Sequence, residues 1–464
     1  MMREYKRYDE YKDSGIEWLG KVPKNWSIVS MNYLVDITTG GKDTVDRNPD
    51  GKYPFFVRSD TIEKIDTYSY DGTAILTPGD GDIGAIFHYI NGKFDFHQRV
   101  YKISEFKNIY PKYLYYYMVA NFKSDVKKLS AKTTVDSLRM PMFKNFKVLN
   151  FSSKEQQKIA SFLDQKTAEI DEIITKKEKL IDHLEKYKKS VITEAVTKGK
   201  LGDKYINEDG ELVDEVETKD SGVDWIGDIP KYWNVNKAKF VADVLLSNIN
   251  KKTKKYEPSV LLCNYTDVYY NDFINLNIDF MKASTSYSKK KKLSLEVGDV
   301  IITKDSESPD DIGIPTCVKE TKENLVCGYH LAMLKANREI ILGEFIFRLL
   351  ESSSINNQFY LNDTGITRYS ISLSTIKNIL IFYPSLDIQK QIIDYLDKKI
   401  VQIDNLIQTT KKSIEKYKEY KKLLIFEAVT GKIDLRDYEL EGGEEIAEHN
   451  NSRETKREEL SEVN

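Results

Sequence analysis

The sequence of 464 residues contains no apolar run of the length that a membrane-spanning helix needs, about 18 residues. Its first residues, MMREYKRYDEYKD, are charged and lack the apolar core of a secretory signal peptide. Only three cysteines occur, Cys263, Cys317 and Cys327, and none forms a CxxC pair. A disulfide framework or a cysteine-rich zinc site is therefore not expected. These absences predict a soluble, cytoplasmic protein with no membrane partner.

Motifs of nucleotide, metal and catalytic sites are also missing. Neither GxxxxGK[ST] nor HExxH occurs. Residues 79–84 fit GxGxxG, but a strand-like run follows where a dinucleotide site needs a helix, and Asp80 and Asp82 would repel phosphate. The segment from Asp46 opens like a calcium loop but has Val57 in place of the required glutamate. The sequence therefore favours a binding protein without a metal or cofactor of its own.

The charge is distributed unevenly along the chain. The net charge of the whole sequence is -3. Residues 437–464 contain ten acidic and three basic side chains, so this segment has a charge of -7 and the remainder +4. The acidic segment also lacks an apolar period, so the tail that contains it, residues 433–464, is predicted to be disordered. The overall charge neither supports nor excludes binding to nucleic acid.

An internal repeat organises the chain. Residues 11–28, YKDSGIEWLGKVPKNWSI, are identical to residues 218–235, TKDSGVDWIGDIPKYWNV, at half of their positions. A second pair, EQQKIASFLDQKTAEIDEII at 155–174 and IQKQIIDYLDKKIVQIDNLI at 388–407, is separated by 233 residues. The chain is therefore a duplicated unit made of a short tryptophan motif, a variable block and a long helix.

Residues 155–197 and 388–430 have the apolar period of amphipathic helices about 40 residues long. Gly199 and Gly431 follow them as stop signals. The two helices share heptad phase, so they can pack against each other as a coiled coil. The alternative is two unrelated surface helices, but these would not be expected to share residues and heptad phase. The predicted apolar seam consists of Ile159, Leu163, Ile170, Ile173, Leu180, Leu184, Tyr187 and Val191 in the first helix, and Ile392, Leu396, Ile403, Leu406, Tyr417, Tyr420 and Leu424 in the second.

The two variable blocks contain short β-rich runs separated by Gly, Asp, Asn and Pro, followed by a helical segment, which predicts a small α/β or α+β domain in each. Strands are expected at 53–57, 73–76, 84–90, 99–103, 259–263, 299–303 and 378–383, and helices at 110–122 and 342–353. The predicted organisation is an N-terminal segment (1–28), a first block (29–150), a first long helix (151–200), a linker with the repeated motif (201–235), a second block (236–384), a second long helix (385–432) and the tail (433–464).

Both blocks contain side chains suited to nucleic acid. Two lysine runs in the second block either neutralise phosphates or form solvated loops. The offset of 233 aligns histidines and hydroxyl side chains of the two blocks, and such hydroxyls either donate to phosphates or cap a turn. Arginine and glutamine beside them suit bidentate reading of guanine and adenine. The predicted DNA-binding residues are His97, Gln98, Arg99, Thr134, Arg139, Lys251, Lys252, Lys254, Lys255, Lys289, Lys290, Lys291, Lys292, His330, Thr367 and Arg368.

From about residue 11 to residue 435, this arrangement resembles the specificity subunit of type I restriction–modification systems. The resemblance rests on the duplicated D-S-G-[IV]-x-W-[LI]-G-x-[VI]-P-x-x-W motif and on the Gly-Asp turns at 79–80 and 298–299. It also rests on TGITRYSIS (364–372), on the helix starts EQQKI and IQKQI, and on the ends EAVTKGKL and EAVTGKIDLR. The first block departs from the pattern, because KTTVDSLRM replaces the TGITRYSIS type.

The resemblance implies an α/β (α+β) fold with two duplicated target recognition domains, joined by two long antiparallel helices that form a coiled coil. Each domain would read one half of a split sequence in double-stranded DNA, and the helices would fix the gap. The chain would have no catalytic activity. It would recruit two methylase subunits and two translocase–nuclease subunits, and these partners would carry S-adenosylmethionine, ATP and magnesium. Two other classes stay open: a solitary coiled-coil scaffold without a nucleic-acid role, and an enzyme whose site has no recognisable motif.

Overall fold

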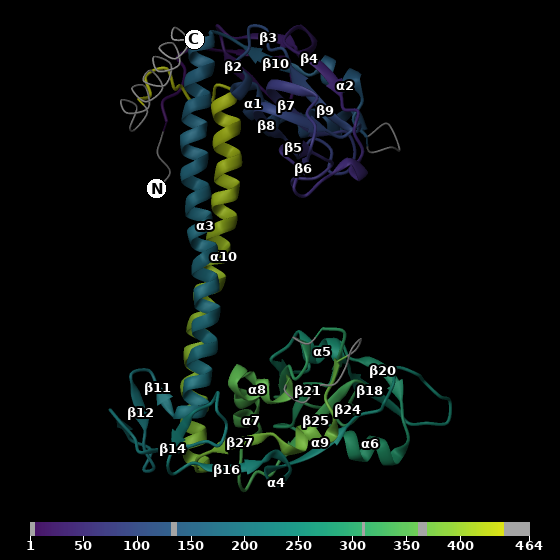
Figure 1. Ribbon diagram of the computed structural model, residues 1–464, viewed down its shortest axis with the longest axis vertical. Helices are drawn as coiled ribbons and strands as arrows, with labels where there is room; N and C mark the ends of the chain where they lie inside the picture. Colours follow the sequence, from purple (N-terminus) through teal and green to yellow (C-terminus); the bar gives the residue numbers. More distant parts are fainter. Residues whose placement is uncertain (1–4, 131–136, 309–310, 361–368, 440–464) are drawn as a thin grey trace. The chain divides into compact units, whose positions relative to one another are not determined.

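The computed structural model in Figure 1 describes residues 5–130, 137–308, 311–360 and 369–439. The chain divides into two compact units, of which the first comprises residues 1–177 and 412–464 and the second residues 178–411. The long helices α3 (Ser153–Lys198) and α10 (Leu386–Val429) pass through both units. Each unit therefore contains one tryptophan motif, one variable block and part of each long helix.

The first unit is built around a six-stranded sheet with strand order β4-β9-β7-β8-β5-β6. The pairs are antiparallel except β5 with β8, which is parallel. Two small antiparallel pairs, β1–β2 and β3–β10, stand outside this sheet. The elements are β1 (Tyr11–Asp13), β2 (Lys21–Pro23), β3 (Ser27–Ser30), η1 (Met31–Tyr33), β4 (Asp36–Thr39), η2 (Thr44–Asp46), β5 (Tyr53–Phe56), β6 (Ile62–Ile65), β7 (Tyr70–Pro78), β8 (His88–Phe96), β9 (Val100–Ser104), α1 (Pro111–Ser130), α2 (Met140–Asn145) and β10 (Lys147–Asn150).

Local sequence explains most of these elements. The helix α1 begins at Pro111, whose fixed φ suits a first helical position. The strands expected at 53–57, 73–76 and 99–103 are confirmed as β5, β7 and β9. The strand expected at 84–90 is wrong at its start, because β8 begins only at His88. Gly84, with a φ of 67°, still belongs to the preceding turn, since this conformation is incompatible with a strand.

The second unit has a five-stranded sheet of order β17-β25-β21-β23-β19 and a three-stranded sheet of order β20-β18-β24. The predicted strands at 259–263, 299–303 and 378–383 are confirmed as β18, β21 and β27. The elements are β11 (Lys200–Leu201), β12 (Lys204–Ile206), β13 (Leu212–Val213), β14 (Thr218–Asp220), β15 (Asp228–Pro230), β16 (Asn234–Lys237), α4 (Ala238–Val241), β17 (Ala242–Leu246), β18 (Ser259–Cys263), α5 (Tyr265–Tyr269), β19 (Phe273–Ile274), β20 (Met281–Ser284), α6 (Tyr287–Leu293), β21 (Val300–Thr303), β22 (Asp305–Ser306), β23 (Pro315–Val318), β24 (Leu325–Cys327), β25 (Leu331–Ala336), α7 (Gly343–Glu351), α8 (Ser353–Tyr360), β26 (Tyr369–Ser370), α9 (Leu373–Asn378) and β27 (Leu380–Tyr383).

The duplicated tryptophan motifs contact the C-terminal ends of the long helices. In the first unit, Trp26 is fully buried, and Gly431 after α10 lies so close to it and to Pro23 that a Cβ at Gly431 would collide with the proline ring. In the second unit, Gly199 after α3 lies against buried Trp233 in the same way. Both glycines have positive φ, of 61° at Gly199 and 70° at Gly431, as a helix C-terminal stop requires.

The long helices contact each other inside each unit through ion pairs that the repeat relates. In the first unit, Lys421 of α10 donates to Asp171 of α3 at 2.6 Å. In the second unit, Lys188 of α3 donates to Asp404 of α10 at 3.0 Å. The offset of 233 residues converts Asp171 into Asp404 and Lys188 into Lys421. The same pair therefore forms twice, with the roles of the two helices exchanged.

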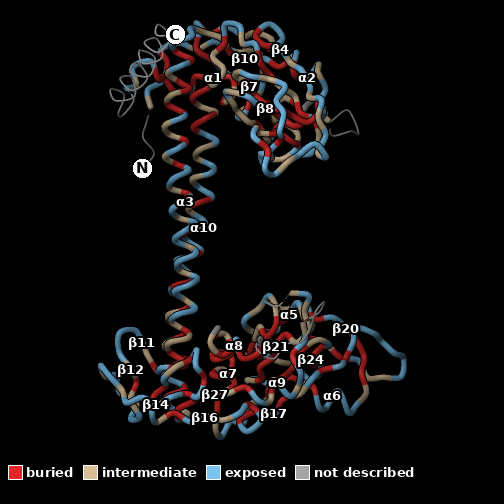
Figure 2. The backbone as a smooth tube through the Cα atoms, viewed as in Figure 1, coloured by how far each residue is buried: buried red, intermediate tan, exposed pale blue. Residues whose placement is uncertain are grey.

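The predicted seam is wrong at three positions. Leu180, Tyr187 and Leu406 are exposed by 46%, 47% and 56% of their surface. The predicted Ile170 and Ile403 are buried, and the buried stripe also includes Ile174, Ile407 and Ile414. Around the boundary between the units most helix residues are exposed, as the pale segments of Figure 2 show. The position next to Tyr187 in the stripe is taken by half-buried Lys188, which the search for apolar residues passed over.

One carboxylate at repeat-equivalent positions joins each variable block to its long helix. In the first unit, Asp164 of α3 accepts a hydrogen bond of 2.6 Å from the Tyr116 hydroxyl and pairs with Lys112 at 3.3 Å. In the second unit, Asp397 of α10 accepts a bond of 2.6 Å from buried Arg348. We name these two groups of contacts the carboxylate anchors.

A second pair of repeat-equivalent side chains supports the same joints. The buried Gln156 accepts from the backbone N–H of Tyr110 at 2.7 Å, and the buried Gln389 accepts from that of Leu342 at 2.9 Å. Each amide thereby satisfies a backbone group just before the helix that follows the sheet. The frame of each block is therefore specified by the repeated part of the sequence.

The residues that follow α10 correct the prediction of a disordered tail from residue 433. Ile433 and Leu435 are buried, and the backbone N–H of Asp434 donates to the carbonyl oxygen of Lys6 at 2.7 Å. Residues 433–439 are therefore part of the first unit. Residues 440–464 lie outside the described residues.

Candidate nucleic-acid interface

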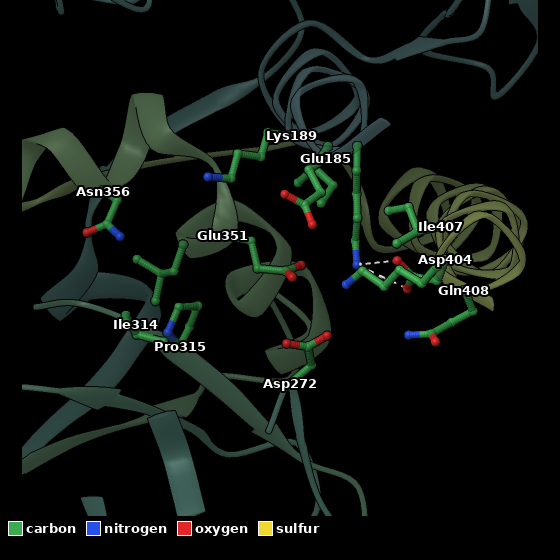
Figure 3. Close-up of a pocket in the computed structure, with 14 residues that line it drawn as sticks. Glu185, Lys189, Asp272, Ile314, Pro315, Glu351, Asn356, Asp404, Ile407 and Gln408 are labelled. Carbon is green, nitrogen blue, oxygen red and sulfur yellow. Dashed lines mark hydrogen bonds and ion pairs between the residues drawn. The ribbon is translucent and has the colours of Figure 1, made fainter. Parts of the chain in front are cut away.

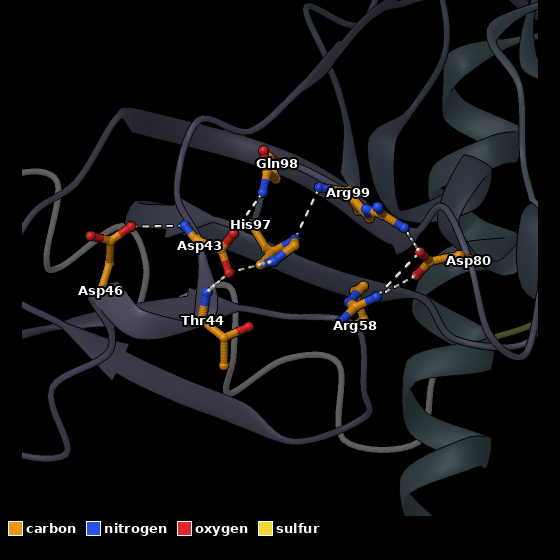
Figure 4. A network of polar contacts seen from close by, with 8 residues as sticks. All are labelled: Asp43, Thr44, Asp46, Arg58, Asp80, His97, Gln98 and Arg99. Carbon is orange, nitrogen blue, oxygen red and sulfur yellow. Dashed lines mark hydrogen bonds and ion pairs between the residues drawn. The ribbon is translucent and has the colours of Figure 1, made fainter.

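A network of polar side chains in the first block contains three of the predicted DNA-binding residues (Figure 4). His97 is buried, and its Nδ1 accepts from the backbone N–H of Arg99 at 3.0 Å. This leaves Nε2 to carry the proton that faces Asp43, 3.5 Å away. Gln98 donates to the other oxygen of Asp43 at 2.7 Å. The histidine thus holds the turn from inside, while Gln98 and Arg99 lie at its surface.

Asp43 is the centre of this part of the network. It begins the short helix η2 and accepts from the backbone N–H of Thr44 at 2.6 Å. This bond is the largest cause of a pKa below the ordinary value for Asp43, and the charge of His97 acts in the same direction. The carboxylate therefore stays ionised at neutral pH.

Asp80 forms the other half of the network. It lies just after β7 and accepts from Arg99 Nη1 at 2.8 Å and from Arg58 Nη1 at 3.3 Å. Burial raises the pKa of Asp80, but the two guanidinium groups outweigh it, so the net shift is downward. The carboxylate is only 21% exposed, whereas the side chains of Arg99 and Arg58 are 64% and 47% exposed.

The second block has its own network around Asp305. His330 Nδ1 lies 2.8 Å from Asp305 Oδ2, and Ser370 and Lys304 contact the other oxygen. Burial raises the pKa of Asp305, but the hydrogen bonds from Lys304, Ser370 and His330 together lower it by more, so the net shift is downward. The network borders a cleft of about 430 Å³ that is also lined by Tyr265, Thr266, Tyr269, Tyr270, Ser306, Glu307 and Asp311.

The two networks occupy equivalent places in the two blocks. The backbone N–H of Leu138 donates to Gly79, and the equivalent N–H of Ile371 donates to Lys304. Asp80 therefore corresponds to Asp305. The pairing of the Gly-Asp turns at 79–80 and 298–299 is corrected by this register, because the first turn follows β7 whereas the second precedes β21. The Gly-Asp dipeptides at 79–80 and 298–299 therefore do not occupy equivalent positions in the two blocks.

The two lysine runs of the second block lie next to each other. The backbone N–H of Lys254 donates to Ser284, which ends β20, and α6 with Lys289, Lys290, Lys291 and Lys292 follows three residues later. A hydrogen bond from Lys254 lowers the pKa of Glu257, and the charge of Lys289 contributes to the same shift. We call Lys251, Lys252, Lys254, Lys255 and Lys289 to Lys292 the lysine cluster. The second run is a helix rather than a loop.

A further cavity of about 590 Å³ lies where α3 and α10 meet the block of the second unit (Figure 3). Its lining includes the ion-paired Lys188 and Asp404 and the buried Glu351. Burial raises the pKa of Glu351, although the neighbouring Arg348 opposes this shift. Arg348 pairs with Glu351 and also binds Asp397, so the cavity lies beside the carboxylate anchor of the second unit.

No group of three or more histidine, cysteine, aspartate or glutamate side chains suited to a metal ion occurs among the residues that the structure describes. Within the same residues, no helix combines the length and apolar character needed to cross a membrane.

The sequence profile of the type I restriction modification DNA specificity domain matches residues 23–183 and 230–416. The chain belongs to this family. The MjaVIII specificity subunit of Methanocaldococcus jannaschii is 24% identical over 432 residues, which are 90% of this chain and 95% of that protein. The EcoDI specificity subunit of Escherichia coli is 29% identical over 177 residues, 38% of this chain and 39% of that subunit.

A solved structure from work on assembly and conformational transition of a type I restriction–modification system shares the fold of this specificity subunit. Its TM-score is 0.64 at 12% identity, and the alignment covers 89% of this chain and 99% of the other. The mixed helix and strand architecture, with one specificity domain matched in each half, agrees with the fold class expected from the sequence.

The structure places the predicted site residues of the specificity subunit in different settings. Arg139 is exposed and precedes α2 as its N-cap residue. His97, Gln98 and Arg99 are brought together with Asp43, and His330 with Asp305. Thr134, Thr367 and Arg368 lie outside the described residues. Their roles, like those of the lysine cluster, stay predictions.

Sequence reasoning missed Asp43, Arg58 and Asp80 as members of the first network. Arg58 was not singled out, although it follows the buried strand β5 closely. Asp80 was considered only as a group that would repel phosphate. The signal was its acidic side chain in a glycine-rich turn, but its two arginine partners are 22 and 19 residues away along the chain. Such a pairing follows from tertiary structure and not from spacing.

The lysine cluster leads to a prediction about salt dependence. Replacing Lys289 to Lys292 by alanine should weaken binding to all DNA sequences alike and lower the slope of log affinity against log salt by roughly 0.9 for each lost phosphate contact. Alanine is a strong helix former, so α6 should persist. Fluorescence anisotropy with random duplexes at several salt concentrations measures the slope.

The control for this variant replaces Lys416 and Lys418, two exposed lysines of α10, and should leave the slope unchanged. If the variant of α6 keeps both affinity and slope, the run is a solvated helix. If it loses discrimination between sequences at an unchanged slope, it contacts bases.

Proposed function

We propose that this chain is the DNA-recognition subunit of a type I restriction–modification complex, in which each specificity domain reads one half of a bipartite site. One observation carries the proposal. The two domains share a duplicated frame, seen in the equivalent anchors at Asp164 and Asp397, yet they present different polar networks at equivalent positions. Equal frames with unequal surfaces suit the reading of two different half-sequences by one protein.

The long helices would act as an antiparallel coiled coil that sets the gap between the half-sites. The repeat-related ion pairs Asp171–Lys421 and Lys188–Asp404 support this role, because both fit a single antiparallel register. The buried isoleucine stripes of the two helices support it further. Lysines in the stripe, each paired with an aspartate across the seam, would oppose a shift of register, because a shift would leave charges unpaired.

The chain itself would bind DNA and not catalyse a reaction. Methylation would come from two methylase subunits that use S-adenosylmethionine, and cleavage from two translocase–nuclease subunits that use ATP and magnesium. The polar networks on both blocks favour this role over a coiled-coil scaffold without nucleic acid. A scaffold would not need exposed arginines and lysines arranged on two separate domains.

Methylation mapping tests the proposal. The chain is produced together with the methylase subunit of its own system in a host without other methylation, and the modified sequences are read from the host DNA. The expected result is one motif with two defined parts and an unread gap of constant length. A continuous motif, or no modification with a demonstrably assembled complex, would contradict the proposal.

A further inference from the structure

The contact between Asp80 and two arginines assigns a base preference to the first block, and this assignment rests on the proposed function. Arg58 lies just after β5 and Arg99 just before β9, so the fold brings two guanidinium groups to one carboxylate. Figure 4 shows both groups converging on Asp80. Two cations beside each other would repel without this aspartate. Asp80 therefore fixes their positions before any ligand arrives.

The bonds to Asp80 leave part of each guanidinium group available to another ligand. The bonds to Asp80 use Nη1 of Arg58 and Nη1 of Arg99. A guanidinium carries five N–H donors in a rigid fork, so Nη2 and Nε of each group are not part of these bonds. The side chain of Arg99 is 64% exposed. An arginine held from behind by a carboxylate can present its fork without a large loss of side-chain entropy.

The local charge favours a base edge over the DNA backbone as the ligand. Two arginines and one ionised aspartate have a net charge of only one unit, and the carboxylate would repel a phosphate that approached it. Guanine offers O6 and N7 in the major groove, and an arginine fork matches these two acceptors in a bidentate contact. The lysine cluster of the second block, in contrast, has the charge of a phosphate-binding surface.

The second block has a different chemistry at the equivalent place. Among the described residues, the groups that contact Asp305 are Lys304, His330 and Ser370, and the neighbouring cleft is lined by Glu307 and Asp311. A lysine ammonium and an imidazole lack the planar fork of arginine. Within the part of the chain that the structure describes, two arginines on one carboxylate therefore distinguish the network of the first block from that of the second.

We propose that Arg99, positioned by Asp80 together with Arg58, reads a guanine in the half-site recognised by the first block. Arg99 is the residue that touches the base. Asp80 is a positioning residue, because its carboxylate is turned toward the two arginines and only 21% exposed. The ligand is thus the major-groove edge of a guanine–cytosine pair in duplex DNA.

The test uses the assembled complex of this chain with its methylase subunits. Arg99→Lys keeps the charge and loses the fork. It should reduce the preference for guanine at one position of the first half-site by about 10- to 100-fold, without changing the salt slope. Asp80→Asn should reduce the same preference, because the arginines are no longer held. Arg47→Lys is the matched control, since Arg47 is an exposed arginine of the same block that pairs with Glu63 and should not affect base preference.

A measurement on the DNA avoids dependence on variants that fold poorly. Replacing each guanine of the first half-site by 7-deazaguanine removes the N7 acceptor. One such replacement should weaken binding of the wild-type complex and have a smaller effect on the Arg99→Lys complex, whose ammonium lacks the bidentate fork. Recognition of the second half-site is the internal control for folding.

Two results would overturn this inference: a first half-site without guanine, or full guanine preference in Arg99→Lys. A uniform loss of affinity with a lower salt slope in Arg99→Ala would instead make Arg99 a phosphate contact. If the wild-type complex recognises no bipartite sequence at all, the proposed function fails. A failure of the guanine assignment alone leaves that bipartite recognition intact, so the two failures are distinguishable.

Discussion

Replacing residues 29–150 with the corresponding block of another specificity subunit is expected to change one half of the methylated sequence and leave the other half unchanged. The physical reason is the junction. The chain enters the block through β3 and leaves it through β10, and these strands pair side by side with Lys147 opposite Ser30. A block inserted at this junction has to restore one short pair of strands and its own side of the contacts with Asp164 and Gln156.

The effect of this exchange should be large. Modification of the original site should fall by about a thousandfold or more, the range that separates specific from non-specific DNA binding. Methylation mapping of the chimera gives the new motif. The reciprocal exchange of residues 236–384 is the control and should alter only the other half. A chimera in which both halves change would show that the blocks do not read independently.

Matched insertions of one helical turn in both long helices should lengthen the unread gap. Four residues after Lys177 in α3 and four after Lys411 in α10 fall at the boundary between the two units. The ion pairs Asp171–Lys421 and Lys188–Asp404 lie on opposite sides of that boundary, so both should persist. Four residues add about 6 Å to a helix, and DNA advances about 3.4 Å per base pair. The gap should grow by one or two base pairs, with both half-sequences kept.

Methylation mapping measures this gap as well. An insertion after Lys177 alone should lengthen the unread gap by no more than the matched insertions do, because α10 keeps its length. The same four residues inserted in the turn at 207–211, between β12 and β13, should leave the gap as it is. An active complex with matched insertions and the original gap would show that these helices do not set the spacing.

The sequence predicts the long helices well because their signal is a repeated period over many turns. It fails within them where a side chain serves two chemistries. Lys188 is partly buried and donates to Asp404 of the other helix, whereas the neighbouring Tyr187, whose apolar ring predicts a seam position, is exposed. Strands such as β7 were found from short apolar runs. The start of β8 was not, because the conformation of Gly84 decides where the turn ends.

The candidate interface was predictable by residue type but not by arrangement. The exposed Gln98 and Arg99 stand out in the sequence as side chains that read bases. Their aspartate partners do not, because Asp43 and Asp80 come from other loops and meet them only in the folded block. The two lysine runs are separate in the sequence, and β18 and β20 bring them together. Long-range pairing of this kind leaves no local pattern.

The carboxylate anchors connect a constant part of the chain, the repeated helices, to the parts that differ, the variable blocks. Asp164 and Asp397 belong to the repeated helices, whereas their partners belong to the variable blocks: a phenol and an ammonium in one case, a guanidinium in the other. At the carboxylate the helix requires a hydrogen-bond donor of the block, and at Gln156 or Gln389 it binds a backbone N–H, which any residue except proline supplies. Blocks of unrelated sequence can meet that demand. The donors at Asp164 and Asp397 differ in chemistry although the two carboxylates are equivalent, so one helix position accommodates blocks of different sequence.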